Sequence, residues 1–237
     1  MNLVDCIPLP HPGPHDVALW RVDFAFDRTL AAPAFDTLSV EERERAARFH
    51  RHQDAIRFAS VRAALRAVLS HTTKIDAGRI RIAADEAGRP CMLDSPVSVD
   101  FNVSHSGAHG LIALSTRRRV GVDIETRAPG FDWRSIARST LTADELAWLQ
   151  GLDAAQSQHA FFDAWVAKEA LLKAVGVGIS EHLTQLTVLP SCIGGFVPRK
   201  QRPLAVRTFL AAWTQAPQGY AACIAWSESP AEVTQNA

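Results

Sequence analysis

One order of predicted elements occurs twice along this chain of 237 residues, and it constrains the fold more than any single motif. A long helix, a strand and a hairpin are expected over 53–70, 79–84 and 97–103 with 110–115. The same order returns over 154–175, 185–190 and 204–213 with 219–227. The match is one of pattern and not of residues. It favours an α+β fold of two similar α/β halves, 1–117 and 118–237, with a ligand site in the cleft between them.

Local signals place the starts of further elements. Ser39 with Glu42, and Thr142 with Glu145, have the spacing of capping boxes, so we expect a helix to begin at each pair. A strand is expected over 17–24. The sequence DEAGRP, ending at Pro90, is expected to form a turn.

Composition narrows the class of protein. Lys plus Arg equals Asp plus Glu, at 25 each, so no overall field favours nucleic acid or an acidic membrane. The basic run at 117–119 lacks interleaved aromatic residues and is interpreted as a solvated linker between the halves. No apolar stretch approaches the roughly 20 residues that span a bilayer, and no signal peptide is evident. Four scattered cysteines without a CxxC pattern are expected to be reduced, as in a cytoplasmic protein.

The segment WVAKEALLK, residues 165–173, lies within the second long predicted helix. At about 100° per residue, its polar members are expected to share one side of the helix with Trp165. They are Lys168, Glu169 and Lys173. On an exposed helix, Glu169 and Lys173 would be an ordinary ion pair worth about 0.2–0.5 kcal/mol, and Trp165 would be a core residue. Alternatively, the stripe is one wall of a functional site.

A pair of acids on a predicted strand supplies complementary chemistry. In VGVDIE, Asp123 and Glu125 are two residues apart, so both project from one face of the strand. Two parallel carboxylates are tolerated if they are solvated, or if a hard cation such as Mg²⁺ lies between them. Glu169 would add a third carboxylate, and Lys168 and Lys173 would suit the phosphate oxygens of a pyrophosphate. An edge strand with two solvated acids is the alternative.

Further candidate ligands lie near turns. Ser104 and His105 end a predicted strand, where His105 either binds a phosphate or packs in a hairpin. A metal site formed by His105 and His109 is rejected, because a Gly-containing turn prevents a helical pair. Gly88 permits close approach of the backbone to a ligand, and Arg89 offers a planar donor.

Taken in order, these motifs resemble a known family. GVDIE at 121–125 followed by WVAKEALLK resembles the paired signature of the phosphopantetheinyl transferase superfamily. FNVSHSG and AGRP, which lie upstream, resemble the large two-lobed type that acts on carrier proteins of peptide, polyketide and fatty acid synthases. RFHRHQDAIRF resembles the N-terminal helical segment of that type. The resemblance covers most of residues 40–190 and implies a monomer whose halves are related by a pseudo-twofold axis.

The resemblance also implies an activity. The 4′-phosphopantetheine arm of coenzyme A would pass to a serine hydroxyl of an apo acyl or peptidyl carrier protein, with release of 3′,5′-ADP and a need for Mg²⁺ or Mn²⁺. Matched positions assign the metal to Asp123, Glu125 and Glu169, and catalysis to Glu169 and Lys173. They assign coenzyme A to Arg45, Arg57, Gly88, Arg89, Pro90, Ser104, His105 and Lys168. The N-terminal half would hold the adenine and the 3′-phosphate, and the C-terminal half the metal.

This sequence departs from the family at one position. Glu42 stands where some members carry a lysine, which leaves the ligands of the 3′-phosphate open. Residues 191–203 match nothing in the family pattern. Two other functions stay open at this point: a different Mg²⁺-dependent phosphoryl or nucleotidyl transferase, and a non-catalytic module that binds coenzyme A or a carrier protein. No nucleic-acid or membrane partner is expected.

Overall fold

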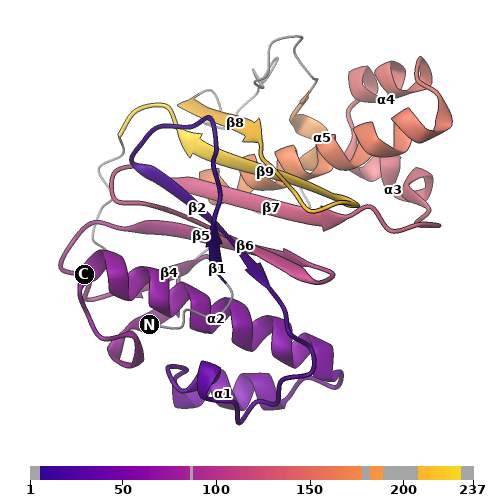
Figure 1. Ribbon diagram of the computed structural model, residues 1–237. Helices are drawn as coiled ribbons and strands as arrows, with labels where there is room; N and C mark the ends of the chain where they lie inside the picture. Colours follow the sequence, from indigo (N-terminus) through magenta and orange to yellow (C-terminus); the bar gives the residue numbers. More distant parts are fainter. Residues whose placement is uncertain (1–5, 86–87, 178–181, 189–207, 231–237) are drawn as a thin grey trace.

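The protein is described by a computed structural model, in which residues 6–85, 88–177, 182–188 and 208–230 are placed. Figure 1 shows two halves, each with a sheet packed against one long helix. Among the described residues, no helix is both long and apolar enough to cross a membrane.

The N-terminal half contains a four-stranded antiparallel sheet in the order β1-β2-β6-β5. Its strands are β1 (Cys6–Pro8), β2 (Val17–Asp23), β5 (Asp100–Ser106) and β6 (His109–Ser115). Helix α2 (His52–Thr73) packs against this sheet, and α1 (Val40–Ala47) packs against α2. A separate hairpin pairs β3 (Arg81–Ala84) with β4 (Pro90–Leu93). Short 3₁₀ helices occupy Pro33–Phe35 and Ala77–Arg79.

The C-terminal half contains a three-stranded antiparallel sheet in the order β7-β9-β8. Its strands are β7 (Val120–Thr126), β8 (Phe209–Trp213) and β9 (Tyr220–Ser227). Helix α5 (Ala154–Val175) contacts all three strands, and α3 (Trp133–Thr140) and α4 (Ala143–Gln150) pack against α5.

The two halves have the same order of elements. The series β2, α2, β5, β6 corresponds to β7, α5, β8, β9, and the sheet orders β2-β6-β5 and β7-β9-β8 correspond as well. The prediction of an α+β fold with two similar halves is therefore confirmed. The pseudo-twofold axis that the family resemblance implies stays a prediction.

Most predicted elements lie close to their expected bounds. Both predicted capping boxes are present, at Ser39 and Thr142, and a third at Asp153 opens α5. The strand expected over 185–190 is wrong in its described part, which is a 3₁₀ helix, Leu183–Gln185, followed by one bridge residue, Thr187. Residues 189–207, which include part of the predicted strand 204–213, lie outside the described residues.

Two strands, β1 and β4, and one α-helix, α3, were not predicted. Strand β4 begins at Pro90, a residue that argues against a central strand but is tolerated where the strand has one neighbour, as here. Helix α3 is short, and its Trp133 stacks on Phe161 of α5 at a centroid distance of 5.3 Å. Tertiary packing therefore supports α3, and a local sequence pattern does not record that packing.

A shared core fixes the halves relative to each other. One apolar cluster fills each half, and a third lies between the two sheets. This third cluster joins Leu19 and Leu111 of the N-terminal half to Val122, Ile224 and Trp226 of the C-terminal half. Because all five side chains are buried, the joint between the halves is packed like a domain interior.

A row of polar side chains also joins β5 to β7. Alternate residues of β5 face β7, as the period of two in a strand requires. Three of them accept hydrogen bonds from backbone N–H groups of β7. These bonds run from Val120, Val122 and Thr126 to Asp100, Asn102 and Ser106, at 2.7, 3.0 and 3.1 Å.

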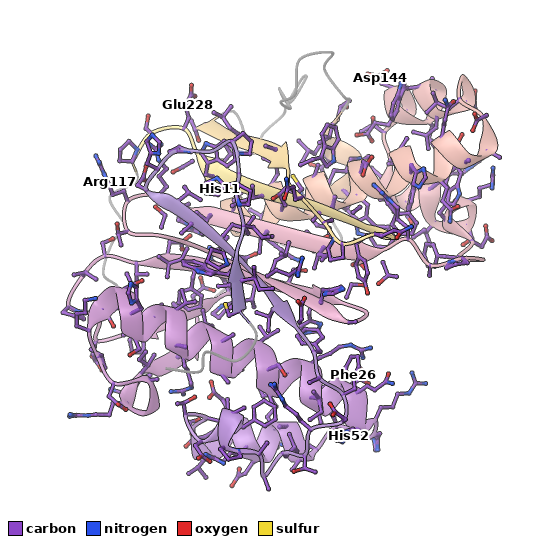
Figure 2. The ribbon with its side chains drawn as sticks, in the orientation of Figure 1. His11, Phe26, His52, Arg117, Asp144 and Glu228 are labelled. Atoms are coloured by element: carbon purple, nitrogen blue, oxygen red, sulfur yellow. The ribbon has the colours of Figure 1, made fainter. Side chains whose placement is uncertain are left out.

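The start of α2 is tied to the segment after β2. Figure 2 shows Phe26 and His52 beside each other at this end of the helix, where His52 Nε2 lies 3.0 Å from the Phe26 carbonyl oxygen. Arg57 places its guanidinium 5.1 Å from the Phe26 ring centroid. Its Nε donates to the Gly107 carbonyl oxygen at 2.7 Å, so Arg57 supports the turn between β5 and β6.

Candidate functional site

A glycine allows α5 to lie directly on β7. A Cβ atom at Gly121 would stand 2.0 Å from the Ala170 carbonyl oxygen and 2.5 Å from the Ala174 nitrogen. Only the absence of a side chain permits this approach. As a result, Glu169 and Lys173 on α5 lie next to the acids of β7.

Asp123 is the centre of this group. Its side chain is almost fully buried, and its Oδ1 accepts hydrogen bonds from Lys173 Nζ at 2.6 Å and Ser104 Oγ at 2.7 Å. Its Oδ2 is also buried but has no hydrogen-bond partner among the described residues. A buried carboxylate oxygen without a partner is costly, so this atom is available for a ligand.

Glu125 and Glu169 flank Asp123. Glu125 Oε2 accepts from Ser106 Oγ at 2.9 Å, and burial together with the nearby Asp123 raises the pKa of Glu125 to about 7. Burial and Asp123 also raise the pKa of Glu169, whose Oε1 accepts from Trp165 Nε1 at 3.1 Å. Trp165 thus packs on the apolar cluster of the C-terminal half and also orients Glu169.

Lys173 partly compensates these charges. Burial alone would lower the pKa of Lys173, but the carboxylates around it, first Asp123 and then Glu169, raise the value instead. Its Nζ lies 3.7 Å from Glu169 Oε2. The ammonium therefore stays charged and sits between two carboxylates.

The carboxylate oxygens of Asp123, Glu125 and Glu169 are of a type that suits a hard cation. Oxygen ligands are those that Mg²⁺ prefers, and the free Asp123 Oδ2 and the raised pKa of Glu125 both indicate negative charge that a cation would offset. In their present positions, the described His, Cys, Asp and Glu side chains form no group of three that converges on one metal position. Lys173 occupies part of the space between Asp123 and Glu169. The metal assignment therefore stays a prediction.

Ser104 and His105 do not share one surface. Because neighbouring residues of a strand face opposite ways, Ser104 faces Asp123 while His105 lines a cavity on the other side of β5. Burial, followed by the positive charges of Arg57 and Lys173, lowers the pKa of His105. His105 therefore offers a neutral imidazole to a ligand at neutral pH.

This cavity has a volume of about 760 Å³ and lies between α1, α2, β5 and the β3–β4 hairpin. Gly88, Pro90 and Arg45, which the resemblance assigns to coenzyme A, all line it. Its other charged lining residues are Glu41, Glu42, Arg62, Arg66, Arg79 and Arg81. The excess of arginine makes the cavity suitable for a polyanion.

Sequence reasoning missed the arginines that follow Arg57. Phe58, Arg62 and Arg66 recur every four residues and therefore lie on one face of α2. This four-residue spacing could have indicated from sequence that the two arginines share one face of the helix. The predicted Arg57 does not line the cavity, since its guanidinium bonds Gly107 and pairs with Asp54 at 2.6 Å.

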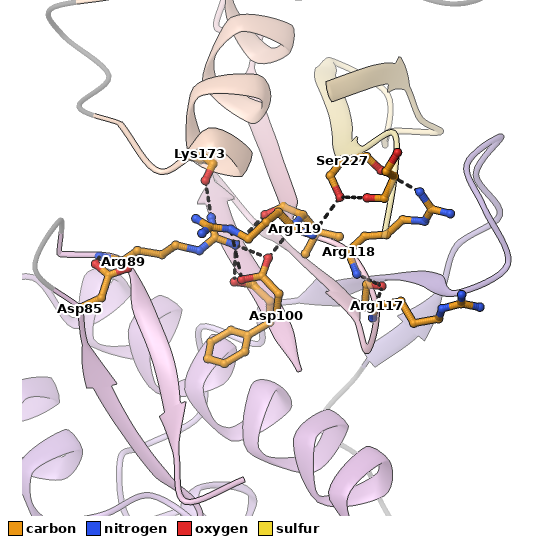
Figure 3. A network of polar contacts seen from close by, with 12 residues as sticks. Asp85, Arg89, Asp100, Arg117, Arg118, Arg119, Lys173 and Ser227 are labelled. Carbon is orange, nitrogen blue, oxygen red and sulfur yellow. Dashed lines mark hydrogen bonds and ion pairs between the residues drawn. The ribbon is translucent and has the colours of Figure 1, made fainter. Parts of the chain in front are cut away.

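The expectation that the Arg89 guanidinium faces coenzyme A is wrong. Arg89 is only 9% exposed, and its guanidinium donates to Asp100 Oδ2 at 2.7 Å and to the carbonyl oxygens of Phe101, Val120 and Lys173 (Figure 3). The guanidinium therefore pairs with the buried carboxylate of Asp100 and does not face a ligand. Arg89, which directly precedes β4, thereby connects this end of the hairpin with β5, β7 and the last turn of α5.

The run 117–119 is not simply a solvated linker, although Arg117 is exposed. Arg118 Nε pairs with Asp16 Oδ2 at 3.0 Å, and its Nη1 donates to the Ser227 carbonyl oxygen at 2.9 Å (Figure 3). Arg119 Nε lies 3.7 Å from Asp100 Oδ1. Two of the three arginines therefore help to fix the joint.

Lys168 also differs from its expected place. Its side chain is fully buried, pairs with Glu145 Oε2 at 2.5 Å and donates to the carbonyl oxygens of Thr140 and Leu183 at 2.7 and 2.9 Å. Lys168 and Lys173 are five residues apart, which turns their side chains about 140° from each other around the helix. Lys168 holds α3 and α4 against α5 and does not face the carboxylates of β7.

Comparison with known proteins agrees with this geometry. A family described as the 4′-phosphopantetheinyl transferase superfamily matches residues 119–225, and one described as the N-terminal part of 4′-phosphopantetheinyl transferase matches 28–117. HetI of Nostoc sp., a 4′-phosphopantetheinyl transferase, is 32% identical over 168 residues, which cover 70% of this chain and 71% of that protein. The chain belongs to the 4′-phosphopantetheinyl transferase superfamily.

Other relatives extend the match. The 4′-phosphopantetheinyl transferase ffp of Bacillus subtilis is 30% identical over 217 residues, covering 88% of this chain and 93% of ffp. A putative 4′-phosphopantetheinyl transferase of Synechocystis sp. is 36% identical over 161 residues, or 68% of this chain and 65% of that protein. This phosphopantetheinyl transferase is of the two-domain type, which acts with coenzyme A and carrier proteins.

Proposed function

We propose that the carboxylates of Asp123, Glu125 and Glu169 form the reaction centre of this transferase, and that coenzyme A occupies the cavity that begins at His105. The observation that carries this proposal is the buried Asp123, which bonds Lys173 on one oxygen and leaves the other without a partner. The basic cavity lies on the side of β5 that faces away from Asp123.

The reaction joins a serine hydroxyl of an apo acyl or peptidyl carrier protein to the 4′-phosphopantetheine arm. The serine oxygen forms a bond to the phosphorus that carries pantetheine, and the bond from that phosphorus to the bridging oxygen breaks. 3′,5′-ADP leaves with the electron pair, and the hydroxyl proton goes to a base. Positioning and charge compensation are the main tasks of the protein in such a displacement.

Glu169 is suited to accept the proton. Its raised pKa brings it closer to neutral pH, where a general base works best, and Trp165 fixes one of its oxygens. Lys173 remains protonated and offsets the charge that develops on the leaving phosphate.

Asp123, Glu125 and Glu169 would hold a divalent cation. When bound, Mg²⁺ supplies charge neutralisation to the diphosphate, and Mn²⁺, which accepts the same oxygen ligands, would serve as well. The monomeric state, the cytoplasmic location and the absence of nucleic-acid or membrane partners stay predictions.

The test is intact-protein mass spectrometry of an apo carrier protein incubated with the enzyme, coenzyme A and Mg²⁺, with EDTA in a parallel sample. We expect a metal-dependent gain of one phosphopantetheine arm. Glu169→Gln should lower the transfer rate by about 10²–10⁴-fold while calorimetry still detects coenzyme A binding. Asp144→Asn is the matched control, because Asp144 lies exposed on α4, away from the β7 carboxylates (Figure 2).

The alternatives give different results. Reaction with nucleoside triphosphates and indifference to coenzyme A would indicate another phosphoryl or nucleotidyl transferase. Coenzyme A binding without transfer to carrier proteins from several pathways would indicate a non-catalytic module. Full activity in Glu169→Gln would exclude Glu169 as the base.

A further inference from the structure

The end of β5 and the turn that follows it join the cavity to the carboxylates. His105 lines the cavity, and the next residue, Ser106, donates from its Oγ to Glu125 Oε2 at 2.9 Å. Ser106 Oγ also accepts from the Thr126 backbone nitrogen at 3.1 Å and lies 3.1 Å from Thr126 Oγ1. A movement of this turn against β7 would therefore shift Glu125 relative to a ligand in the cavity.

Tyr220, the first residue of β9, holds the turn from the C-terminal half. Its Oη accepts a hydrogen bond from the Ala108 backbone nitrogen at 3.0 Å. Its ring meets the His109 ring edge-on, with 4.9 Å between the ring centroids. Because Tyr220 pairs with Thr126 in the register of β7 and β9, it is also fixed to the strand that carries Glu125. One side chain thus links the turn to the carboxylate strand.

The surface that receives the Tyr220 ring is itself held in place. His109 Nδ1 lies 2.6 Å from Asp23 Oδ1. Arg21 donates to the two oxygens of Asp23 at 2.8 and 2.9 Å. A carboxylate bonded to one ring nitrogen fixes the orientation of an imidazole. The Tyr220 ring therefore packs on a side chain that two neighbouring strands, β2 and β6, keep in one position.

The backbone of the turn lies directly against the Tyr220 hydroxyl. Gly107 has a φ of +55°, and a Cβ atom there would stand 2.3 Å from Tyr220 Oη and 2.7 Å from Thr126 Oγ1. Only glycine adopts this conformation without steric cost. From the N-terminal half, Arg57 Nε bonds the Gly107 carbonyl oxygen at 2.7 Å. The turn is therefore held from both halves, and the length of the tyrosine side chain sets its distance from β9.

We infer that Tyr220 is a positioning residue for the transfer reaction. Its hydroxyl holds the β5–β6 turn so that Ser106 keeps Glu125 in register with the diphosphate of bound coenzyme A. This inference rests on the proposed function, which places Glu125 in the reaction centre and coenzyme A in the cavity. Since Tyr220 acts through the turn and does not line the cavity, its loss should reduce turnover and spare the affinity for coenzyme A.

The experiment compares wild type with Tyr220→Phe in steady-state transfer to an apo carrier protein, with coenzyme A as the varied substrate. Phenylalanine keeps the ring against His109 and removes the hydroxyl. We expect kcat to fall about tenfold or more, because a group of the reaction centre loses its position. The KM for coenzyme A and its calorimetric Kd should each change by less than about twofold, because binding of the ground state is unaffected.

Thr72→Val is the matched control. Thr72 Oγ1 donates to the Val68 carbonyl oxygen at 3.0 Å within α2, so this variant also loses one hydroxyl hydrogen bond. Both variants should lower the melting temperature by a similar amount, about 2–4 °C. Only Tyr220→Phe should lower kcat, which separates a positioning role from a contribution to stability alone.

A double-mutant cycle with Gly107→Ala tests the contact itself. In wild type the new Cβ collides with Tyr220 Oη, so Gly107→Ala should lower kcat. In Tyr220→Phe this collision is absent, and the same substitution should lower kcat by a smaller factor. The two factors should differ about threefold or more, as for residues in direct contact.

Three results would overturn the role of Tyr220. They are a wild-type kcat in Tyr220→Phe, a fall in rate that is explained by weaker coenzyme A binding, and equal factors for Gly107→Ala in the two backgrounds. Glu125→Gln separates this inference from the proposed function, because it should lower kcat at least as much as Tyr220→Phe. Wild-type turnover in Glu125→Gln would overturn the proposed reaction centre, whereas wild-type turnover in Tyr220→Phe alone would overturn only this inference.

Discussion

Gly121→Ala is expected to push α5 away from β7. The new Cβ would stand 2.0 Å from the Ala170 carbonyl oxygen and 2.5 Å from the Ala174 nitrogen, whereas ordinary contact begins at 3.4 Å. Both neighbours are backbone atoms, so no rotamer change relieves the clash, and the helix must retreat by more than 1 Å. Overpacking of this kind costs about 1–3 kcal/mol of unfolding free energy.

The same displacement should affect catalysis more strongly. Lys173 Nζ lies 2.6 Å from Asp123 Oδ1, and a shift of this size breaks that contact and moves Glu169 along with it. A misplacement of about 1 Å in a reacting group can lower a rate about 10²-fold. Coenzyme A binding should change little, because the cavity is built from the N-terminal half.

Urea unfolding and the carrier-protein transfer rate measure the two effects. Gly151→Ala is the matched control, because its Cβ would lie 3.5 Å from the nearest atom, the Trp148 carbonyl oxygen. That variant should stay within about 0.5 kcal/mol of wild type. Wild-type stability and rate in Gly121→Ala would show that the approach of α5 to β7 does not set the site.

Two further predictions concern buried charges. Arg89→Ala leaves the Asp100 carboxylate buried without its main partner. Urea unfolding should therefore show a loss of about 3–5 kcal/mol of unfolding free energy, and a smaller loss in Arg89→Lys. A loss below about 1 kcal/mol in Arg89→Ala would contradict the importance of this network. In metal-free enzyme the pKa of Glu125, about 7 against an ordinary 4.5, means that the folded state keeps a proton that the unfolded chain releases between these pH values. This contribution to stability is complete below pH 4.5 and is lost as the pH rises to about 7, so Glu125→Gln should flatten the decline seen by denaturant unfolding across that window. An identical slope in both proteins would refute the shift.

The features that were predictable from sequence are local ones. The capping boxes at Ser39 and Thr142 depend on residues three positions apart, and α5 combines good helix formers with an apolar face. The grouping of Asp123 with Glu125 follows from strand alternation alone. These predictions needed no knowledge of which elements meet in space.

The errors concern side chains whose direction depends on a distant partner. Lys168 lies on the predicted helix, but Glu145 of α4 draws it into the core on another side. Arg89 lies in the predicted turn region, but Asp100 and three carbonyl oxygens occupy its guanidinium. A buried charge takes the orientation that satisfies it, and that orientation follows from tertiary contacts.

The strand β5 shows how one local pattern acquires two functions. Its sequence DFNVSHS alternates, so that Asn102 and Ser104 face β7, while Val103 and His105 line the cavity. A slip of one residue would exchange the two sets and remove both the support of Asp123 and the cavity wall. The hydrogen bonds from the backbone of β7 prevent such a slip, because their side-chain acceptors, Asp100, Asn102 and Ser106, all lie on one face of β5. The register of this single strand therefore places the coenzyme A cavity and the carboxylates on opposite sides of one wall, with Ser104 and His105 as the adjacent residues through which the two sites meet.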